Sequence, residues 1–203
     1  MGRYTGPKGK LSRREGVELH LKGSRSFSDK SALKRKPYIP GQHGNKRTGR
    51  LTEYGLRLRE KQKVKRMYGL RERQFRNLYR ESVRRARNVN SDKGLELLRL
   101  LETRLDNVLY SAGLAASRAQ ARQYVTHKKV TVNGEVLNIP SYEVKVGDEV
   151  ALRDAKLAPA ERLITTPLWI ATSGVNAKVE MLPERDMIDE GIKENLIIEY
   201  YSR

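Results

Sequence analysis

The sequence contains no cysteine, and this absence excludes two kinds of site at once. Without thiols the chain forms neither a disulfide framework nor a thiolate-bound metal site. The three histidines, His20, His43 and His127, are scattered, and none stands in a metal-binding spacing such as H-E-x-x-H. We therefore expect no metal and no other cofactor.

Long apolar runs are also missing. No stretch approaches the ~20 apolar residues that a membrane-spanning helix needs. Met1 is followed by Gly2, Arg3 and Tyr4 with no hydrophobic stretch behind them, so the sequence predicts no secretory signal. The Ser or Thr that a myristoylation site prefers is absent as well. These features predict a soluble, intracellular protein with no membrane partner.

The motifs of common enzyme classes are missing too. The sequence holds no phosphate-binding loop G-x-x-x-x-G-K-[ST], no G-x-S-x-G nucleophile elbow and no G-x-G-x-x-G fingerprint. Aromatic residues make up 6% of the chain and form no cluster on which unpaired bases would stack. We therefore predict that the protein is not an enzyme.

What the sequence has in excess is positive charge. It holds 42 Lys and Arg against 24 Asp and Glu, for a formal net charge of +18. Residues 1–100 carry 29 basic and 9 acidic residues, whereas 101–203 carry 13 and 15. A charge of this size repels itself unless an anion neutralises it. Nucleic acid is the first candidate partner and an acidic membrane surface the second, while a merely solvated basic face is the alternative.

The composition changes along the chain and suggests four segments. Residues 1–50 are rich in Gly, Ser, Lys and Arg without a sustained hydrophobic period, which predicts a basic N-terminal arm. Residues 51–102 show helical periodicity, 103–166 change character and predict a small module of two helices and β-hairpins, and 167–203 form a C-terminal segment. Within the arm, prolines and glycines over 37–44 exclude a helix. The arm either stays disordered or lies along RNA and orders on binding.

Residues 51–102 predict basic helices. Thr52 is suited to begin a helix that Gly69 ends. On the next helix five arginines follow helical spacing and, at about 100° per residue, lie within a stripe roughly 80° wide. We call these five residues the arginine ridge: Arg73, Arg76, Arg80, Arg84 and Arg87. Arginine suits bidentate phosphate contacts, so the ridge predicts a phosphate-binding surface; a solvated ridge is the alternative.

The module at 103–166 begins with helical periodicity that stops at Gly113. Ser117 and Gln120 have the spacing of a capping box, which predicts a second helix ending near Lys128. Three basic residues share one face of that helix and its end: Arg118, Arg122 and Lys129. Like the arginine ridge, this face is a candidate phosphate contact.

Strands follow this helix. Asn133-Gly134 between alternating apolar residues predicts a hairpin over 130–136, and further strands are predicted over 142–146 and 149–152. Residues 196–203 are too apolar for a free tail and should dock on the protein. The sequence therefore predicts an α+β fold, with a mainly helical domain, a small module of two helices and β-hairpins, and a C-terminal segment that returns to the helical domain.

Several motifs together resemble one family. The stretches that carry the resemblance are Gly2-Arg3-Tyr4-Thr5-Gly6-Pro7, Pro40-Gly41-Gln42-His43-Gly44, Leu58-Arg59-Glu60-Lys61-Gln62-Lys63, Glu72-Arg73-Gln74-Phe75-Arg76-Asn77, Arg104-Leu105-Asp106-Asn107-Val108, 117–134 and 194–203. They are similar to the blocks of the small-subunit ribosomal protein number four family of bacterial type. The resemblance covers essentially the whole chain.

The resemblance implies a function and partners. Such proteins bind the 16S ribosomal RNA of the small subunit early and nucleate assembly of the subunit body. They contact ribosomal protein number five at an interface that influences decoding accuracy, and some repress their own mRNA. The chain would then be a cytoplasmic constituent of the small ribosomal subunit that recognises folded RNA mostly through phosphates and shape.

Charge, motifs and resemblance together predict the residues that contact ribosomal RNA, and none that is catalytic or metal-binding. The predicted contact residues are Arg3, Lys8, Arg13, Arg14, Arg35, Lys36, Gln42, His43, Arg47, Arg57, Lys61, Lys63, Arg73, Arg76, Arg80, Arg84, Arg87, Arg104, Arg118, Gln120, Arg122, Lys128 and Lys129.

The sequence departs from the family at one point and leaves two rival functions. Some relatives carry four cysteines for zinc near the N-terminus, where this chain has Gly9, Ser12, Ser26 and Ser31. Zinc is therefore not carried over, and the arm must hold its shape without metal. An enzyme built on the same module would need a catalytic domain for which the chain has no room. A general DNA-compacting protein would bind duplex DNA and folded RNA equally well.

Overall fold

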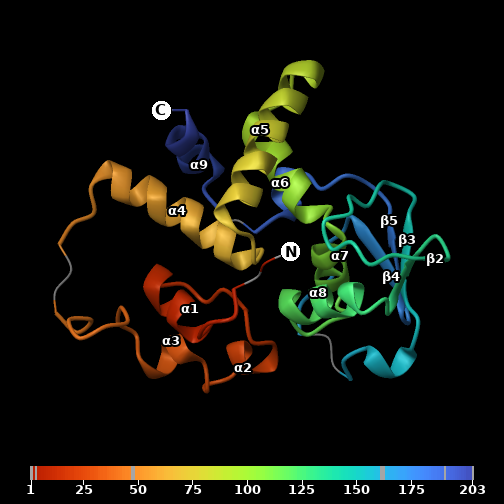
Figure 1. Ribbon diagram of the computed structural model, residues 1–203, viewed down its shortest axis with the longest axis horizontal. Coiled ribbons are helices and arrows are strands. Elements are labelled where there is room, and N and C mark those ends of the chain that lie inside the picture. Colours follow the sequence, from red (N-terminus) through yellow and green to blue (C-terminus); the bar gives the residue numbers. More distant parts are fainter. Residues whose placement is uncertain (1, 3, 47–48, 161–162, 190, 203) are drawn as a thin grey trace. The chain divides into compact units, whose positions relative to one another are not determined.

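The computed structural model describes residues 2, 4–46, 49–160, 163–189 and 191–202 (Figure 1). Two compact units emerge, one formed by Met1–Arg80 with Glu190–Arg203 and the other by Glu81–Asp189. Helices dominate the first unit, and the second combines helices with an antiparallel sheet. The α+β class is thereby confirmed. The four-segment division of the chain stays a prediction, because compactness does not define independently folding segments.

The N-terminal residues contain more regular structure than their composition predicts. They form the short helices α1 (Gly9–Glu15), α2 (Ser24–Phe27) and α3 (Ala32–Arg35), and Leu19, between α1 and α2 in the chain, is fully buried. Helices this short are unstable alone and depend on tertiary contacts, which a hydrophobic period does not reveal. The arm over 1–50 and its order without RNA stay predictions, whereas the stretch 37–44 has only turns and bends, as predicted.

Helix α4 (Glu53–Met67) begins and ends as its sequence predicts. The Oγ1 atom of Thr52 accepts a hydrogen bond from the backbone N–H of Gly55 at 3.2 Å, which caps the helix. Gly69 follows the helix in the left-handed conformation with φ 65°, where glycine is favoured. Helix α9 (Glu194–Tyr201) packs along α4 and buries Ile197 completely (Figure 1). The predicted docking of the C-terminal residues is confirmed.

The boundary between the units falls inside helix α5 (Glu72–Val89), after Arg80. The second unit continues with α6 (Lys93–Glu102), α7 (Leu105–Ser111) and α8 (Arg118–Thr126). Helix α6 buries Leu97, Leu98 and Leu101 completely, as its leucine-rich sequence requires. Among the described residues, no helix combines the length and apolar character needed to cross a membrane.

The strands of the second unit form one antiparallel sheet in the order β2-β1-β3-β5-β4. Their bounds are Val130–Val132, Glu135–Val136, Glu149–Leu152, Ile170–Ser173 and Asn176–Val179 for β1 to β5, and short 3-10 helices cover Ala155–Leu157 and Arg185–Met187. Asn133 and Gly134 connect β1 to β2 with positive φ angles of 51° and 84°, as a type I′ turn requires. The predicted hairpin is therefore confirmed.

The predicted strand over 142–146 is wrong. Its backbone instead pairs with the link between α6 and α7, through the bonds Leu105 N–H to Tyr142 O and Val144 N–H to Thr103 O, both 2.8 Å. In the part of the chain that the structure describes, this contact is an isolated bridge between Arg104 and Glu143. Alternation of apolar residues predicts an extended backbone but not which neighbour it pairs with.

The core of the second unit lies between one face of the sheet and helices α7 and α8. Alternate strand residues point inward, so Val130 and Val150 are fully buried. Val108 of α7 and Val125 of α8 pack into the same cluster. This core fixes α8 against α7 (Figure 1).

Candidate nucleic-acid interface

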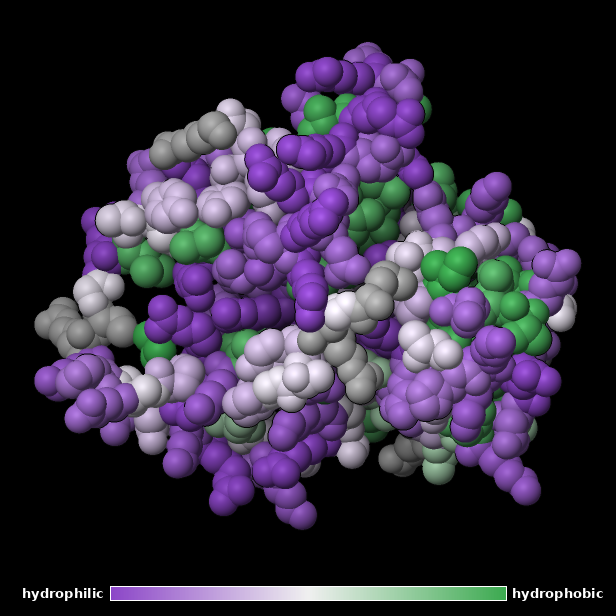
Figure 2. Space-filling view, in the orientation of Figure 1, coloured by the Kyte–Doolittle hydropathy of each residue, from purple (hydrophilic) through white to green (hydrophobic). Residues whose placement is uncertain are grey.

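The arginine ridge lies on the exposed side of α5. On the opposite side Phe75, Ser82 and Ala86 are buried, so packing of that side leaves the ridge in solvent. All five ridge arginines are exposed, and Figure 2 shows α5 covered mainly by hydrophilic side chains. The predicted placement of these residues on one exposed stripe is confirmed, and their contact with RNA stays a prediction.

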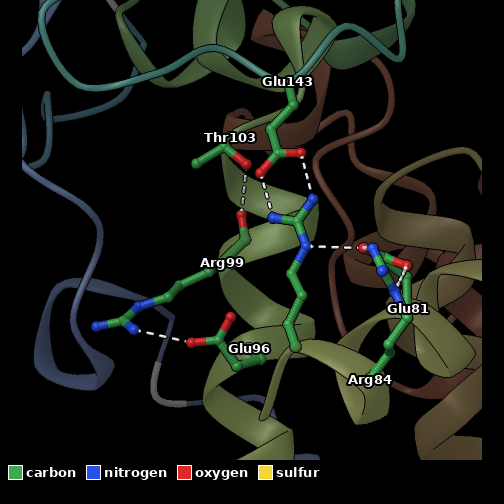
Figure 3. Close-up of polar contacts among 7 residues, drawn as sticks. Glu81, Arg84, Glu96, Arg99, Thr103 and Glu143 are labelled. Atoms are coloured by element: carbon green, nitrogen blue, oxygen red, sulfur yellow. Dashed lines mark hydrogen bonds and ion pairs between the residues drawn. The ribbon is translucent and has the colours of Figure 1, made fainter. Parts of the chain in front are cut away.

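Glu81 sits beside the ridge and offsets part of its charge. It accepts hydrogen bonds from Nε and Nη2 of Arg84, at 2.9 and 2.7 Å, and from Nε of Arg85 at 3.0 Å. These hydrogen bonds from Arg84 and Arg85 lower the pKa of Glu81 to about 2, so it is ionised at neutral pH. Arg85 also donates to both carboxylate oxygens of Glu143, and Figure 3 shows Glu143 and Glu81 turned toward this contact.

Helices α7 and α8 of the second unit form a second basic surface. Nε of Arg118 donates to Oδ1 of Asn107 at 2.7 Å, and its guanidinium carbon lies 4.4 Å from the centre of the Tyr110 ring. Nη1 of Arg122 donates to Oδ2 of Asp106 at 3.0 Å. Both arginines are only partly exposed. In contrast to the ridge, these guanidinium groups are held by a neighbouring helix.

The start of α8 differs in one detail from the predicted capping box. Oγ of Ser117 accepts a hydrogen bond from the backbone N–H of Gln120 at 3.3 Å, as predicted. The Gln120 side chain does not return to Ser117, because its oxygen accepts from the backbone N–H of Ala116 at 2.8 Å and its nitrogen donates to Tyr124 Oη at 2.6 Å. The serine part of the capping box is confirmed, whereas Gln120 bonds to Ala116 and Tyr124 instead of to Ser117.

The basic residues after α8 are well exposed. Lys128 and Lys129 follow the helix, and Lys128 adopts a positive φ of 58°. Nη1 of Arg153 donates to the carbonyl oxygen of Lys128 at 3.2 Å, and the backbone N–H of Arg153 donates to the carbonyl oxygen of Lys129 at 3.1 Å. The backbone that carries these two lysines is therefore fixed while their side chains remain in solvent.

Two predicted contact residues are buried. Arg104 is 5% exposed and donates to both oxygens of Asp106, at 3.0 and 2.9 Å. Lys61 is 2% exposed, donates to Oε1 of Glu72 at 2.7 Å and lies 4.4 Å from the Tyr200 ring centre. A buried charge needs such partners, so both side chains stabilise their own unit.

Two further predicted residues are engaged at the α4 surface. Nε of Arg57 donates to Oε2 of Glu199 at 2.6 Å, and Nζ of Lys63 lies 2.7 Å from Oε1 of Glu60. Both basic side chains are largely covered, with 16% and 12% of their surface exposed. Their cations are thus committed to carboxylates of the same unit.

Some predicted contact residues of the N-terminal region bond to the backbone of their own unit, and others are exposed. Nε of Arg13 donates to the carbonyl oxygens of Lys36 and Tyr38 at 3.1 and 3.0 Å, and Nζ of Lys8 approaches that of Leu21 at 3.5 Å. The exposed ones are Arg14, Arg35, Lys36, Gln42 and His43. The predictions for Arg3 and Arg47 lie outside the described residues.

The positions at which some relatives carry cysteines form a hydrogen-bonded cluster here. Ser12, Ser26 and Ser31 are all buried. Ser12 Oγ donates to Glu18 Oε1 at 3.1 Å, and Ser31 Oγ donates to the other oxygen of that carboxylate. Serine hydroxyls are poor zinc ligands, and no group of three or more metal-ligating side chains occurs in the described ranges. These residues do not fit zinc.

Comparison with known proteins finds family models that cover the residues of both basic surfaces. Residues 3–102 match the family model described as "Ribosomal protein S4/S9 N-terminal domain", and residues 103–150 match that of the S4 domain. The small ribosomal subunit protein uS4 of Dictyoglomus turgidum is 51% identical over 211 residues, covering 100% of both chains. The chain belongs to the uS4 family. The proteins of that name from Thermus thermophilus and Variovorax paradoxus are 47% and 48% identical, again over 100% of both chains.

Membership of the uS4 family confirms the resemblance seen in the motifs. It also confirms that the protein is not an enzyme, because the uS4 proteins are structural components of the ribosome. The S4 domain is an RNA-binding domain, and the residues that match it contain helices α7 and α8. The N-terminal family model contains the arginine ridge.

Sequence reasoning missed the residues that hold these arginines in place. Asp106 and Asn107 belong to a motif that carries the family resemblance, but their residue types alone assign them no role, and Glu143 lies in the predicted strand over 142–146. The available signal was the adjacency of two short polar residues on an otherwise apolar helix. A polar residue at a buried position needs a partner, and the nearby arginines were the obvious candidates.

Proposed function

We propose that this chain is a structural constituent of the small ribosomal subunit and binds 16S rRNA directly. On this proposal it nucleates assembly of the subunit body and, together with ribosomal protein number five, contributes to translational accuracy. It acts in the cytoplasm, within the subunit. The finer parts of the proposal follow from the family, and the direct binding of RNA is supported by the surfaces described above.

The observation that carries the proposal is the exposed arginine ridge on α5. Five guanidinium groups on one side of a helix can each make a bidentate contact to a phosphate. Among the described residues, the acidic side chain of α5 that pairs with the ridge is Glu81, which binds Arg84. The α7–α8 surface adds arginines whose positions are fixed. Phosphate contacts from the ridge position the protein, and a rigid basic surface senses the shape of the RNA.

A salt titration tests the electrostatic part. Affinity for a fragment of 16S rRNA is measured by filter binding at several salt concentrations. Because phosphate contacts release counterions, log affinity should fall linearly with log salt, with a slope of several units. A slope near zero would show that the charged surfaces do not carry the binding.

Competition separates this function from DNA compaction. Duplex DNA and an unrelated RNA of equal length compete for the protein against the 16S fragment at fixed salt. We expect the 16S fragment to bind more tightly than either competitor. Equal affinity for duplex DNA would favour the rival function.

The assembly role needs a separate experiment. Small subunits are reconstituted from 16S rRNA and the other proteins with and without this chain. We expect later-binding proteins to be depleted from particles that lack it, and ribosomal protein number five to bind more weakly to them. Binding of the purified chain to its own mRNA, measured in the same filter assay, tests self-repression.

A further inference from the structure

Asp106 and Asn107 are neighbours on α7, and each holds one arginine of α8. Asn107 receives Nε of Arg118, and Asp106 receives Nη1 of Arg122. The two arginines are four residues apart, which places them on the same side of α8, one turn from each other. Adjacent residues of one helix thus fix two cations of the next.

The orientation of the Asn107 amide is determined by its other contacts. Its Nδ2 atom donates to the carbonyl oxygen and the Oε2 atom of Glu102, at 3.0 and 2.7 Å. With the nitrogen committed on that side, the amide oxygen faces Arg118. Asn107 is 1% exposed, so water does not offer an alternative partner. The side chain can therefore present its acceptor in one direction only.

The Asp106 carboxylate is fixed in a similar way. Arg104 binds both of its oxygens, and Arg122 shares Oδ2. Asp106 and Arg104 are each 5% exposed, and the Arg122 side chain is 13% exposed. One carboxylate balances one of the two cations, which leaves about one positive charge at this position. An anion that binds here must approach Arg122 from the direction that Asp106 leaves open.

We propose that Asp106 and Asn107 are positioning residues that determine the RNA specificity of the α7–α8 surface. They hold Arg122 and Arg118 in one arrangement, which accepts the phosphate spacing of a folded RNA and penalises other spacings. Because the same contacts keep the two guanidinium groups from reorienting toward phosphates at other spacings, they lower non-specific binding. The inference rests on the proposed RNA-binding function.

The primary test replaces Asp106 with Asn in the full chain. The quantity measured is the ratio of affinities for a 16S rRNA fragment and an unrelated RNA of equal length, at fixed salt. Asp106→Asn releases Arg122, so binding of the unrelated RNA should strengthen while the ratio falls about tenfold. A merely structural role would weaken both affinities together and leave the ratio unchanged, and this result would overturn the proposal.

Two further variants separate position from charge. Arg122→Lys keeps the cation but loses the planar guanidinium that Asp106 holds. It should lower the ratio while leaving the salt slope unchanged. Asp106→Asn made in the Arg122→Lys background should add little, because both changes break the same contact. An unchanged ratio for Arg122→Lys would also overturn the proposal, even if Asp106→Asn does not fold.

The control is Glu135→Gln, which removes one negative charge from an exposed side chain on β2 of the same unit. It should leave the ratio as in the wild type. If it lowers the ratio as much as Asp106→Asn, net charge and not positioning is responsible. A wild-type protein that binds both RNAs equally would refute the proposed function itself, whereas a discriminating wild type with an unaffected Asp106→Asn variant refutes only this inference.

Discussion

Arg85 and Glu143 form a bidentate ion pair between α5 and the loop that precedes β3. Nη2 of Arg85 lies 2.7 Å from Oε2 of Glu143, and Nη1 contacts Oε1. Hydrogen bonding to Glu143, despite the opposing effect of burial, raises the pKa of Arg85 above its ordinary value. Arg85 immediately follows the ridge residue Arg84 but points to a different side of the helix, so it joins the ridge helix to the rest of its unit.

This pair predicts a measurable coupling energy. We expect Arg85→Ala and Glu143→Ala in a double-mutant cycle to give a coupling of about 1 kcal/mol or less, because the side chains are 35% and 43% exposed and water screens them. Urea denaturation of the four proteins measures it. The coupling should shrink in high salt. Arg87→Ala, at an exposed ridge position, is the control and should change stability by less than about 0.5 kcal/mol. A coupling well above 1 kcal/mol, or one that high salt leaves unchanged, would show that water does not screen this pair.

The two basic surfaces should affect RNA binding differently. Arg80→Ala on the exposed ridge should weaken binding to all RNAs alike and lower the salt slope by about one unit, as expected for one lost phosphate contact. Arg122→Ala should lower the slope similarly but also reduce discrimination between 16S rRNA and unrelated RNA, because Arg122 is held by Asp106. Filter binding at fixed salt gives both affinity ratios. If Arg80→Ala reduces discrimination more than Arg122→Ala, the ridge is the specific surface.

Glu72 makes the stability of the first unit depend on pH. Burial raises its pKa, but hydrogen bonds from Lys61, Lys65 and Tyr201 outweigh this effect and lower the pKa to about 2, from an ordinary value of 4.5. Because the folded pKa lies below the unfolded one, the stabilisation is present above about pH 4.5 and is lost as the pH falls toward 2.

Glu72→Gln tests this dependence. At pH 7 the variant should be less stable than the wild type by about 1 kcal/mol, since the buried Lys61 loses a charged partner. The difference should shrink toward zero as the pH falls through 2, because the wild-type carboxylate takes up its proton with a pKa of about 2. Denaturation of both proteins across this range measures it. Asp29→Asn, at a fully exposed carboxylate, should show no comparable pH dependence. A difference that persists unchanged at pH 2 would exclude the ionised carboxylate as its cause.

Removal of metal should have no effect, whereas removal of one carboxylate should. A chelator is expected to leave helical circular dichroism and RNA binding unchanged, because the cluster of Ser12, Ser31 and Glu18 is held by hydrogen bonds. Glu18→Ala leaves two buried hydroxyls without their acceptor and should destabilise the first unit by about 1–3 kcal/mol. Loss of helical signal on adding the chelator alone would reveal a metal site.

Local features of this protein follow from its sequence. Thr52 and Ser117 cap helices where their spacing predicts, and Asn133-Gly134 forms the expected turn. The arginine ridge is exposed because residues at helical spacing share a side and the opposite side is apolar. These features depend on neighbours within about four residues, so the order of the amino acids is sufficient to predict them.

Tertiary structure decided which cations face solvent and which are paired. Arg80, Arg85 and Arg122 are all helical arginines, and nothing in the sequence shows which of them has a partner. In the structure Arg80 is exposed, Arg85 binds Glu143 and Arg122 binds Asp106. Glu143 is 58 residues from Arg85 in the chain, and Asp106 is 16 from Arg122. Such partners meet only when the core brings their elements together, and the burial that results makes an unpaired charge too costly.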